Sequence, residues 1–210
     1  MAIRTKVYID GFNLYHSIDE LRPKKPHLKW VNLWGLSNSL LRAEERLVGV
    51  EYFSAFKKTN IDRLKRHEQY VEALKYHNVS THMGKFKKKK HRCRNCNQSY
   101  IGWEEKETDV HIAVKIVEDA FTNQFDKAII ITADTDLMPP IESVRSFFPE
   151  KDAVVIAPPK RMGHCRSMNP IYEIPVSKLN QNLLPETAFD QNNKPAFKRP
   201  IEYSPPVPPK

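Results

Sequence analysis

The chain has 210 residues, of which 40% are hydrophobic, and its 34 Lys and Arg outnumber its 25 Asp and Glu to give a formal net charge of +9. This length supports one substantial core but not two enzyme-sized domains. Three cysteines and the lack of an apolar run of about 18 residues argue against a disulfide-rich secreted protein and against a membrane span. We expect a soluble cytoplasmic protein without a signal peptide, and the positive charge favours a polyanionic partner.

Apolar runs and helical periodicity alternate along most of the chain. The predicted strands cover residues 6–9, 47–56, 79–86, 127–132 and 153–157, and the predicted helices cover residues 32–47, 61–76, 108–121 and 140–148. Strands separated by helices imply right-handed crossovers and a mostly parallel sheet with helices on both faces. We therefore predict an α/β domain over residues 1–180, whose functional site lies at the carboxyl ends of the strands.

The composition changes after about Gln181 to Asn, Gln and Pro, and the chain finishes YSPPVPPK. A segment of this kind buries too little apolar surface to offset its ordering entropy, so residues 181–210 are predicted to form a flexible tail. A polyproline ligand for a protein partner is the functional alternative for this tail.

Carboxylates stand where the predicted strands end. Asp134 and Asp136 follow a strongly apolar strand, and Asp10 follows the first strand, with Asn13 three residues later. Asp109 opens a helix, on a face that it is expected to share with Glu105. Four valines and alanines of this helix are predicted to pack toward the sheet: Val110, Ala113, Val114 and Val117.

Each acid alone has an ordinary explanation, because Asp-Gly pairs form turns and acidic residues cap helices. Their joint placement favours a metal site, since clustered carboxylates repel one another unless a cation or hydrogen-bond donors compensate them. Oxygen ligands from separate elements suit Mg²⁺ or Mn²⁺, ions that activate water and stabilise charge on a leaving oxygen. The predicted ligands are Asp10, Asp109, Asp134 and Asp136, and Asn13 is predicted to offer an amide to a phosphate or a metal-bound water.

Three blocks of sequence, YIDGFNLYHS, EEKETDVHIAVKIVEDA and IIITADTDLMPPIESV, resemble the signature blocks of the NYN domain, in the LabA-like branch of the PIN-like nucleases. The resemblance covers roughly residues 6–185. It implies a Rossmann-like PIN fold, acidic residues converging on a divalent cation, and hydrolysis of RNA. Carried over block by block, it marks Asp10 and Asn13, then Asp109 with Lys106 nearby, then Asp134 and Asp136. In the third block Ala133 stands where relatives more often have Gly, which restricts the backbone beside Asp134.

Residues 85–100, KFKKKKHRCRNCNQSY, interrupt the α/β alternation with a basic insertion. Basic residues interleaved with Phe86, Tyr100 and Trp103 are typical of a surface that binds phosphates and stacks bases, although a solvated loop is the ordinary explanation and a nuclear import signal is another. The predicted RNA-binding residues are Lys87, Lys88, Lys89, Lys90, Arg92 and Lys106.

The same insertion holds Cys93 and Cys96, which have the spacing of a structural zinc site. Two further ligands would be needed, and the candidates are His82, His91, His164 and Cys165. The alternative is two free thiols in a loop, and a redox pair is disfavoured because no strand-to-helix context precedes it.

The sequence thus predicts a ribonuclease that hydrolyses RNA phosphodiester bonds with an aspartate cluster holding Mg²⁺ or Mn²⁺. Single-stranded RNA is the expected partner, because its bases are accessible for stacking. A non-catalytic RNA-binding adaptor that uses the basic insertion is the alternative. Phosphatase or nucleotide chemistry is disfavoured, since the chain has 6 glycines and no Gly-rich phosphate loop. A homodimer stays an open alternative.

Overall fold

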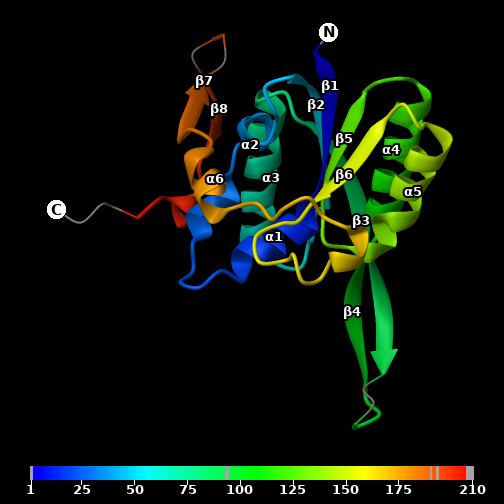
Figure 1. The fold of residues 1–210 in the computed structure, drawn as a ribbon. Helices are drawn as coiled ribbons and strands as arrows, with labels where there is room; N and C mark the ends of the chain where they lie inside the picture. Colours follow the sequence, from blue (N-terminus) through cyan, green and yellow to red (C-terminus); the bar gives the residue numbers. More distant parts are fainter. Residues whose placement is uncertain (1, 93–94, 190, 193, 207–210) are drawn as a thin grey trace.

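A six-stranded sheet forms the centre of the computed structural model, which describes residues 2–92, 95–189, 191–192 and 194–206 (Figure 1). The strand order is β4-β3-β2-β1-β5-β6, and β4 alone is antiparallel to its neighbour. The strands are β1 Ile3–Asp10, β2 Glu45–Ala55, β3 Ser80–Arg92, β4 Ser99–Lys106, β5 Lys127–Ile131 and β6 Asp152–Ile156.

Helices cover both faces of this sheet. They are α1 Gly11–Asp19, α2 Leu33–Ser39, α3 Ile61–Tyr76, α4 Thr108–Phe121, α5 Met138–Phe147 and α6 Val176–Gln181. Helices α1, α2 and α3 pack on one face, and α4 and α5 pack on the other (Figure 1). Short 3-10 helices add four turns: η1 Pro26–Trp30, η2 Thr135–Leu137, η3 Arg166–Met168 and η4 Ile201–Tyr203. The predicted Rossmann-like α/β fold is confirmed.

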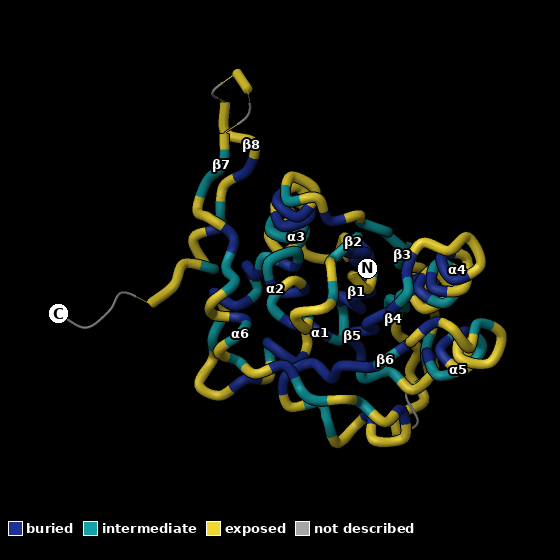
Figure 2. The backbone as a smooth tube through the Cα atoms, turned by 45° about the horizontal axis from the view of Figure 1, so that its top comes forward, coloured by how far each residue is buried: buried dark blue, intermediate teal, exposed yellow. Residues whose placement is uncertain are grey.

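The side chains of successive residues of β1 point alternately to the two faces of the sheet. Val7 and Ile9 belong to the core cluster under α1–α3, and Tyr8 belongs to the cluster under α4 and α5. Figure 2 shows the central strands as buried and the outer sides of the helices as exposed. A sheet covered on both faces explains why its strands are continuous apolar runs rather than alternating ones.

The order in which strands join the sheet reverses at β1, which pairs in parallel with β2 on one side and with β5 on the other. The first three parallel strands run outward in one direction, and the chain then returns to add β5 and β6 beyond β1. In doubly wound sheets, the carboxyl ends of the strands at such a reversal form a crevice that binds ligands. Here the reversal brings the carboxyl ends of β1 and β5 side by side.

The basic insertion is a β-hairpin. Strand β3 pairs with β2 only from Ser80 to Gly84, and from Lys85 onward it pairs with β4. The hairpin projects from the body of the molecule (Figure 1). Gly84 stands where it leaves the sheet, and a Cβ there would lie 2.7 Å from the Thr108 hydroxyl and 2.8 Å from the Lys106 carbonyl. Only glycine lets β3 pass this close to the start of α4.

Two predictions about helices were wrong. The leucine spacing predicted a helix over residues 32–47, but α2 ends at Ser39 and β2 begins at Glu45, so Leu40 and Leu47 reach the core from a turn and a strand. In α4 the predicted inward face is turned outward: Val110 and Val114 are 63% and 61% exposed. Ile112, Ile116 and Ala120 are buried in their place, so the buried stripe of α4 follows the spacing of four residues from Ile112.

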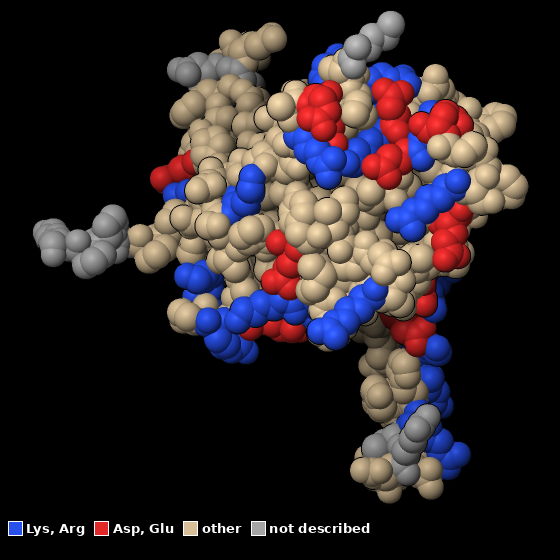
Figure 3. Space-filling model, viewed as in Figure 1, with Lys and Arg blue, Asp and Glu red and all other residues tan. Residues whose placement is uncertain are grey.

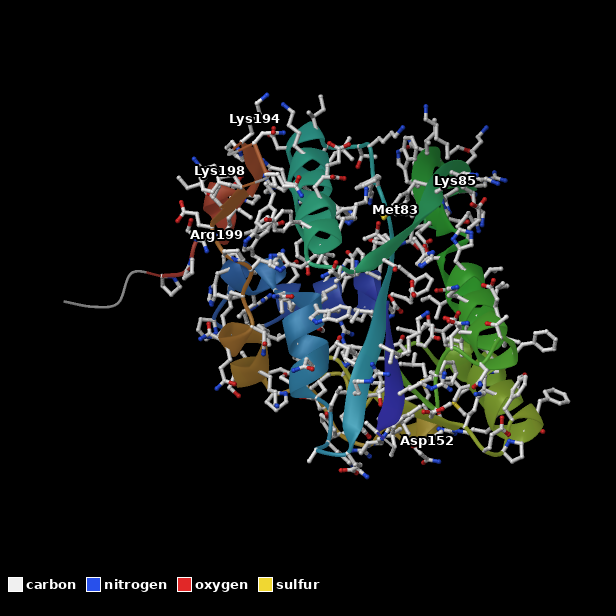
Figure 4. All side chains as sticks on the ribbon, turned by 90° about the horizontal axis from the view of Figure 1, so that it is seen from above. Met83, Lys85, Asp152, Lys194, Lys198 and Arg199 are labelled. Atoms are coloured by element: carbon white, nitrogen blue, oxygen red, sulfur yellow. The ribbon has the colours of Figure 1, made fainter. Side chains whose placement is uncertain are left out.

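The described residues between 181 and 206 are more ordered than the composition of the tail predicted. It contains the antiparallel pair β7 Thr187–Phe189 and β8 Pro195–Lys198. Phe197 is 5% exposed and packs against Trp30 and Tyr76, so one aromatic side chain attaches the segment to the core. Figure 4 shows Lys198 and Arg199 beside α3, on the side away from Met83 and Lys85. Among the residues described, no helix is long and apolar enough to cross a membrane.

Candidate metal centre and active site

Asp10 is the buried member of the acid cluster, because β1 carries it to the edge of the core and α1 begins immediately after it. It is 3% exposed. Its Oδ1 caps α1 by accepting from the Asn13 backbone N–H at 3.0 Å. Its Oδ2 accepts from the Asn13 side-chain amide at 2.6 Å and from the Thr132 hydroxyl at 2.9 Å. These donors hold the carboxylate in one orientation.

Thr132 connects the ends of β1 and β5. Its hydroxyl donates to Asp10 and also accepts the backbone N–H of Asp134 at 3.0 Å. The side chain of Asp134 caps the short helix η2 by accepting from the Asp136 N–H at 3.0 Å. Sequence analysis missed the role of Thr132, although its place directly between a buried strand and the paired acids was a visible signal.

Asn13 bridges the same two strands. Its amide nitrogen donates to Asp10, and its amide oxygen accepts the backbone N–H of Ala133 at 3.3 Å. The residue was predicted to offer its amide to a phosphate or a metal-bound water. Each end of the amide makes one hydrogen bond within the protein, and the nitrogen keeps a second N–H, so that role stays a prediction. The backbone at Ala133 is outside the left-handed region, so alanine is accommodated where relatives more often have glycine.

Asp109 lies on the first turn of α4, which packs on the face of the sheet opposite to α1. Glu105 was expected on the same helix, but it lies on β4, where its side chain accepts from the Thr108 backbone N–H at 3.1 Å and from the Thr108 hydroxyl. Glu105 therefore caps α4 from the neighbouring strand. The hairpin and the helix that carries Asp109 are fixed to each other by this contact.

Three carboxylates meet at this point: oxygens of Asp10, Asp109 and Asp134 lie within 4.8 Å of one another. Asp136 is exposed and is not part of this group, so the prediction that it is a direct ligand is not supported by the geometry. Its backbone N–H instead orients Asp134.

The electrostatics of the cluster fit a bound cation. Burial raises the pKa of Asp10 to about 6, against the opposing effect of hydrogen bonds from Asn13 and Thr132. Partial removal from water raises the pKa of Asp109. Neighbouring carboxylates raise it further: Asp134, Glu105 and Asp136. Three converging acids that disfavour each other's ionisation are stabilised by a divalent ion, and an all-oxygen donor set suits Mg²⁺ or Mn²⁺.

The predicted RNA-binding residues lie on two opposite faces of the hairpin. Lys88 lies opposite Trp103 and Lys90 opposite Ile101, so these side chains and Arg92 share one face. Lys87, Lys89 and Lys106 occupy the other face. There Glu104 forms ion pairs with Lys89 at 2.6 Å and with Lys106 at 2.9 Å. Figure 3 shows cations along one edge of the projecting hairpin.

The described residues form no cluster that matches the predicted zinc site. Cys93 lies outside the described residues, and Cys96 is an exposed free thiol. Two of the proposed further ligands are occupied elsewhere. Cys165 is buried in the core under α4 and α5, and His82 contacts Glu51 at 2.6 Å and stacks on Phe53. The zinc site stays a prediction, and of the four candidates His91 and His164 are left to supply the two further ligands.

A family model for the NYN domain matches residues 4–165, which include all three clustered acids and the hairpin. The chain belongs to the NYN domain family. The observed fold agrees with the PIN-like architecture of this domain, and the narrower LabA-like assignment stays a prediction.

Two individual proteins resemble this NYN domain. The 6-hydroxy-3-succinoylpyridine 3-monooxygenase HspA of Pseudomonas putida is 26% identical, and the match covers 73% of this chain and 59% of that protein. The chain therefore spans well under two thirds of this relative. A crystal structure of a protein of unknown function from Vibrio parahaemolyticus superposes with a TM-score of 0.53 at 14% identity, over 83% of this chain and 93% of the other. That likeness concerns the fold alone.

Proposed function

We propose that this NYN domain is a metal-dependent ribonuclease that hydrolyses phosphodiester bonds of single-stranded RNA. The observation that carries the proposal is the meeting of Asp10, Asp109 and Asp134 within 4.8 Å at the reversal point of the sheet. Membership of a family of PIN-like nucleases supports hydrolysis as the chemistry. The activity named for the Pseudomonas relative belongs to a longer protein, and the acid cluster favours hydrolysis over it.

The three carboxylates would hold one or two Mg²⁺ or Mn²⁺. Such an ion, when bound, would supply an activated water and stabilise charge on the leaving oxygen. Thr132 and Asn13 keep the Asp10 carboxylate in place, and the Asp136 N–H does the same for Asp134. Fixed ligands matter because a loosely held carboxylate binds a small, strictly octahedral ion poorly.

The hairpin would bind the RNA backbone. Its face with Lys88, Lys90 and Arg92 forms no ion pair with any described residue, whereas Glu104 partly neutralises the opposite face. Lys88 also lies 5.4 Å from the centre of the Trp103 ring. Cations interleaved with an aromatic ring favour a single strand whose phosphates and bases are both accessible.

The test is a cleavage assay on end-labelled single-stranded RNA with Mn²⁺, Mg²⁺ or EDTA. Wild type should cut only with metal, and Asp134→Asn should lose at least about 100-fold in rate, because it removes a charged ligand while its oxygen can still cap η2. Asp62→Asn, an exposed carboxylate in the first turn of α3, is the matched control and should cut normally. Cutting by Asp134→Asn at the wild-type rate would overturn the proposal.

The second candidate is a non-catalytic RNA-binding adaptor, which the projecting basic hairpin favours. It predicts RNA binding that weakens with salt and no turnover under any metal condition. Replacing both Lys88 and Lys90 with alanine should weaken RNA binding under either function, and more than replacing both Lys87 and Lys89. Metal-dependent turnover alone separates the two candidates.

A further inference from the structure

A cavity of about 460 Å³ opens beside the acid cluster. Residues of α1, the end of β2, α3 and the hairpin form its walls, and Tyr203 of η4 contributes from the tail. This volume lies in the range of roughly 300–1,000 Å³ that is usual for sites that bind small molecules. None of its aromatic side chains belongs to the acid cluster.

The cavity and the acid cluster share their border. Gly11 and Phe12, which line the cavity, follow Asp10 directly in the chain. Glu105, on the other side, also lines the cavity and caps the helix that begins one residue before Asp109. A ligand in the cavity therefore lies next to whatever the three carboxylates hold.

Aromatic rings form much of the wall. Phe12 and Phe86 meet edge to face with their ring centres 5.9 Å apart, and Trp103 lies on the same hairpin face as Phe86. All three side chains are only partly buried, so ring surface stays accessible to a ligand. A planar heterocycle stacks favourably on such rings, whichever base it is.

One wall offers hydrogen bonds. The Ser54 hydroxyl lies 3.3 Å and the Tyr52 hydroxyl 3.4 Å from Nε2 of His67. Burial lowers the pKa of His67 to about 4, so its ring is neutral at pH 7 and can both donate and accept. Two hydroxyls and a neutral imidazole that contact one another retain unused donors and lone pairs for the edge of a base.

Cations stand at the rim. Lys57 and Arg63 line the cavity, are exposed, and form no ion pair with any residue in the described part of the chain. The Lys57 ammonium lies 5.8 Å from the centre of the Phe86 ring. Arg66, by contrast, is paired with Glu202 at 2.7 Å. Two free cations beside an aromatic cavity are suited to the phosphate of a nucleotide whose base is inside.

We propose that this cavity is a nucleotide pocket that receives one unpaired base of the RNA strand. The base stacks on Phe86 and Trp103, its edge meets Ser54 and His67, and its phosphate meets Lys57 and Arg63. The next phosphodiester then reaches the acid cluster. A paired base cannot enter, so the pocket selects single-stranded substrate. This inference rests on the proposed function for the identity of the strand, but the pocket itself can be tested without cleavage.

The experiment is calorimetric titration of the full chain with uridine 5′-monophosphate, adenosine 5′-monophosphate and ribose 5-phosphate in EDTA. We expect both nucleotides to bind at least tenfold more tightly than ribose 5-phosphate, which lacks the base. Trp103→Ala should weaken nucleotide binding by roughly 5- to 150-fold, the usual loss of one stacking partner. Tyr100→Ala, on the opposite hairpin face, is the matched control and should change binding less than twofold.

A second pair of variants tests the cations at the rim of the cavity. Arg63→Ala should weaken the binding of uridine 5′-monophosphate but not the binding of uridine. Lys65→Ala, on the same helix but outside the cavity, should weaken the binding of neither compound. Melting temperatures of all variants verify folding. The pocket proposal would be overturned if ribose 5-phosphate bound as tightly as the nucleotides. It would also be overturned if Trp103→Ala and Tyr100→Ala had the same affinity for nucleotides. Nucleotide binding with these dependences in a protein that cuts no RNA would uphold the pocket and reject the nuclease, so the two failures are distinguishable.

Discussion

Thr132 donates its hydroxyl hydrogen to the buried carboxylate of Asp10 across 2.9 Å, and so ties the end of β5 to the end of β1. The same oxygen accepts the backbone N–H of Asp134. One hydroxyl group thereby fixes the relative positions of two of the three clustered acids.

Thr132→Val should therefore weaken Mn²⁺ binding by about 10- to 100-fold, the usual effect of removing a group that orients a metal ligand. Valine has nearly the same shape, so the loss reports the hydroxyl and not a cavity. Titration of Mn²⁺ by calorimetry measures the change. Thr132→Ser keeps the hydroxyl and should bind within about threefold of wild type; equal affinities for the valine and serine variants would contradict the linking role.

Metal affinity should depend on pH through Asp10. Its pKa of about 6 in the folded protein lies above its ordinary value of 3.8. The carboxyl must lose its proton to bind a cation, so the affinity for Mn²⁺ should fall about tenfold per pH unit below 6 and level off above it. Calorimetric titrations between pH 5 and 8 measure this, and a constant affinity over that range would contradict it.

The metal-free fold should be limited by repulsion within the cluster. The pKa of folded Asp109 is raised, so its contribution to stability is fully present below the unfolded pKa of 3.8 and is lost as pH rises through the folded value. Asp109→Asn removes this loss and should raise the melting temperature at pH 7 in EDTA, by about 2 to 4 °C for each kcal/mol regained. At pH 3.5 the variant and wild type should melt alike.

Adding Mn²⁺ at pH 7 should reverse that order. The ion stabilises the wild type by binding the folded state, and it should stabilise Asp109→Asn far less. Thermal melts with and without Mn²⁺ give the comparison. A variant that is less stable than wild type in EDTA would show that the Asp109 charge is favourable without metal, which contradicts the electrostatic account.

A buried ion-pair network should support the sheet beneath the site. Lys6 contacts Glu51 at 2.8 Å and Asp119 at 2.7 Å, and all three residues are at least 91% buried. Lys6→Met should destabilise the fold by about 3–5 kcal/mol, because it leaves two carboxylates without their buried cation. Lys115→Met removes a more exposed partner of Asp119 and should cost about 1 kcal/mol or less. Urea unfolding measures both, and equal losses would contradict this view.

Periodicity predicted the elements that pack regularly. The bounds of α3 and α4 match the predicted helices at residues 61–76 and 108–121, because each presents one continuous buried stripe between clear ends. Periodicity predicted less well which face of a helix is buried and where a helix ends. In α4 it favoured the valines over Ile112 and Ile116, since apolar residues lie on both sides of that helix.

The candidate site was predictable where a strand end delivers an acid, as at Asp10 and Asp134. The sequence could not show that Asp136 lies outside the group, because two residues of separation decide nothing about side-chain direction in a 3-10 turn. Nor could it show the cavity, whose walls come from residues as distant as Phe12, Trp103 and Tyr203. Such contacts depend on the tertiary fold, not on local pattern.

The proposed function requires the three-carboxylate cluster to be a metal centre that cuts RNA. The most direct measurement determines Mn²⁺ binding, RNA affinity and RNA cleavage on the same preparations of wild type and Asp134→Asn. We expect cleavage to appear as the metal site fills, and we expect the variant to lose both metal binding and cleavage while keeping its RNA affinity. Cleavage in EDTA, or undiminished cleavage by a variant that no longer binds metal, would contradict it.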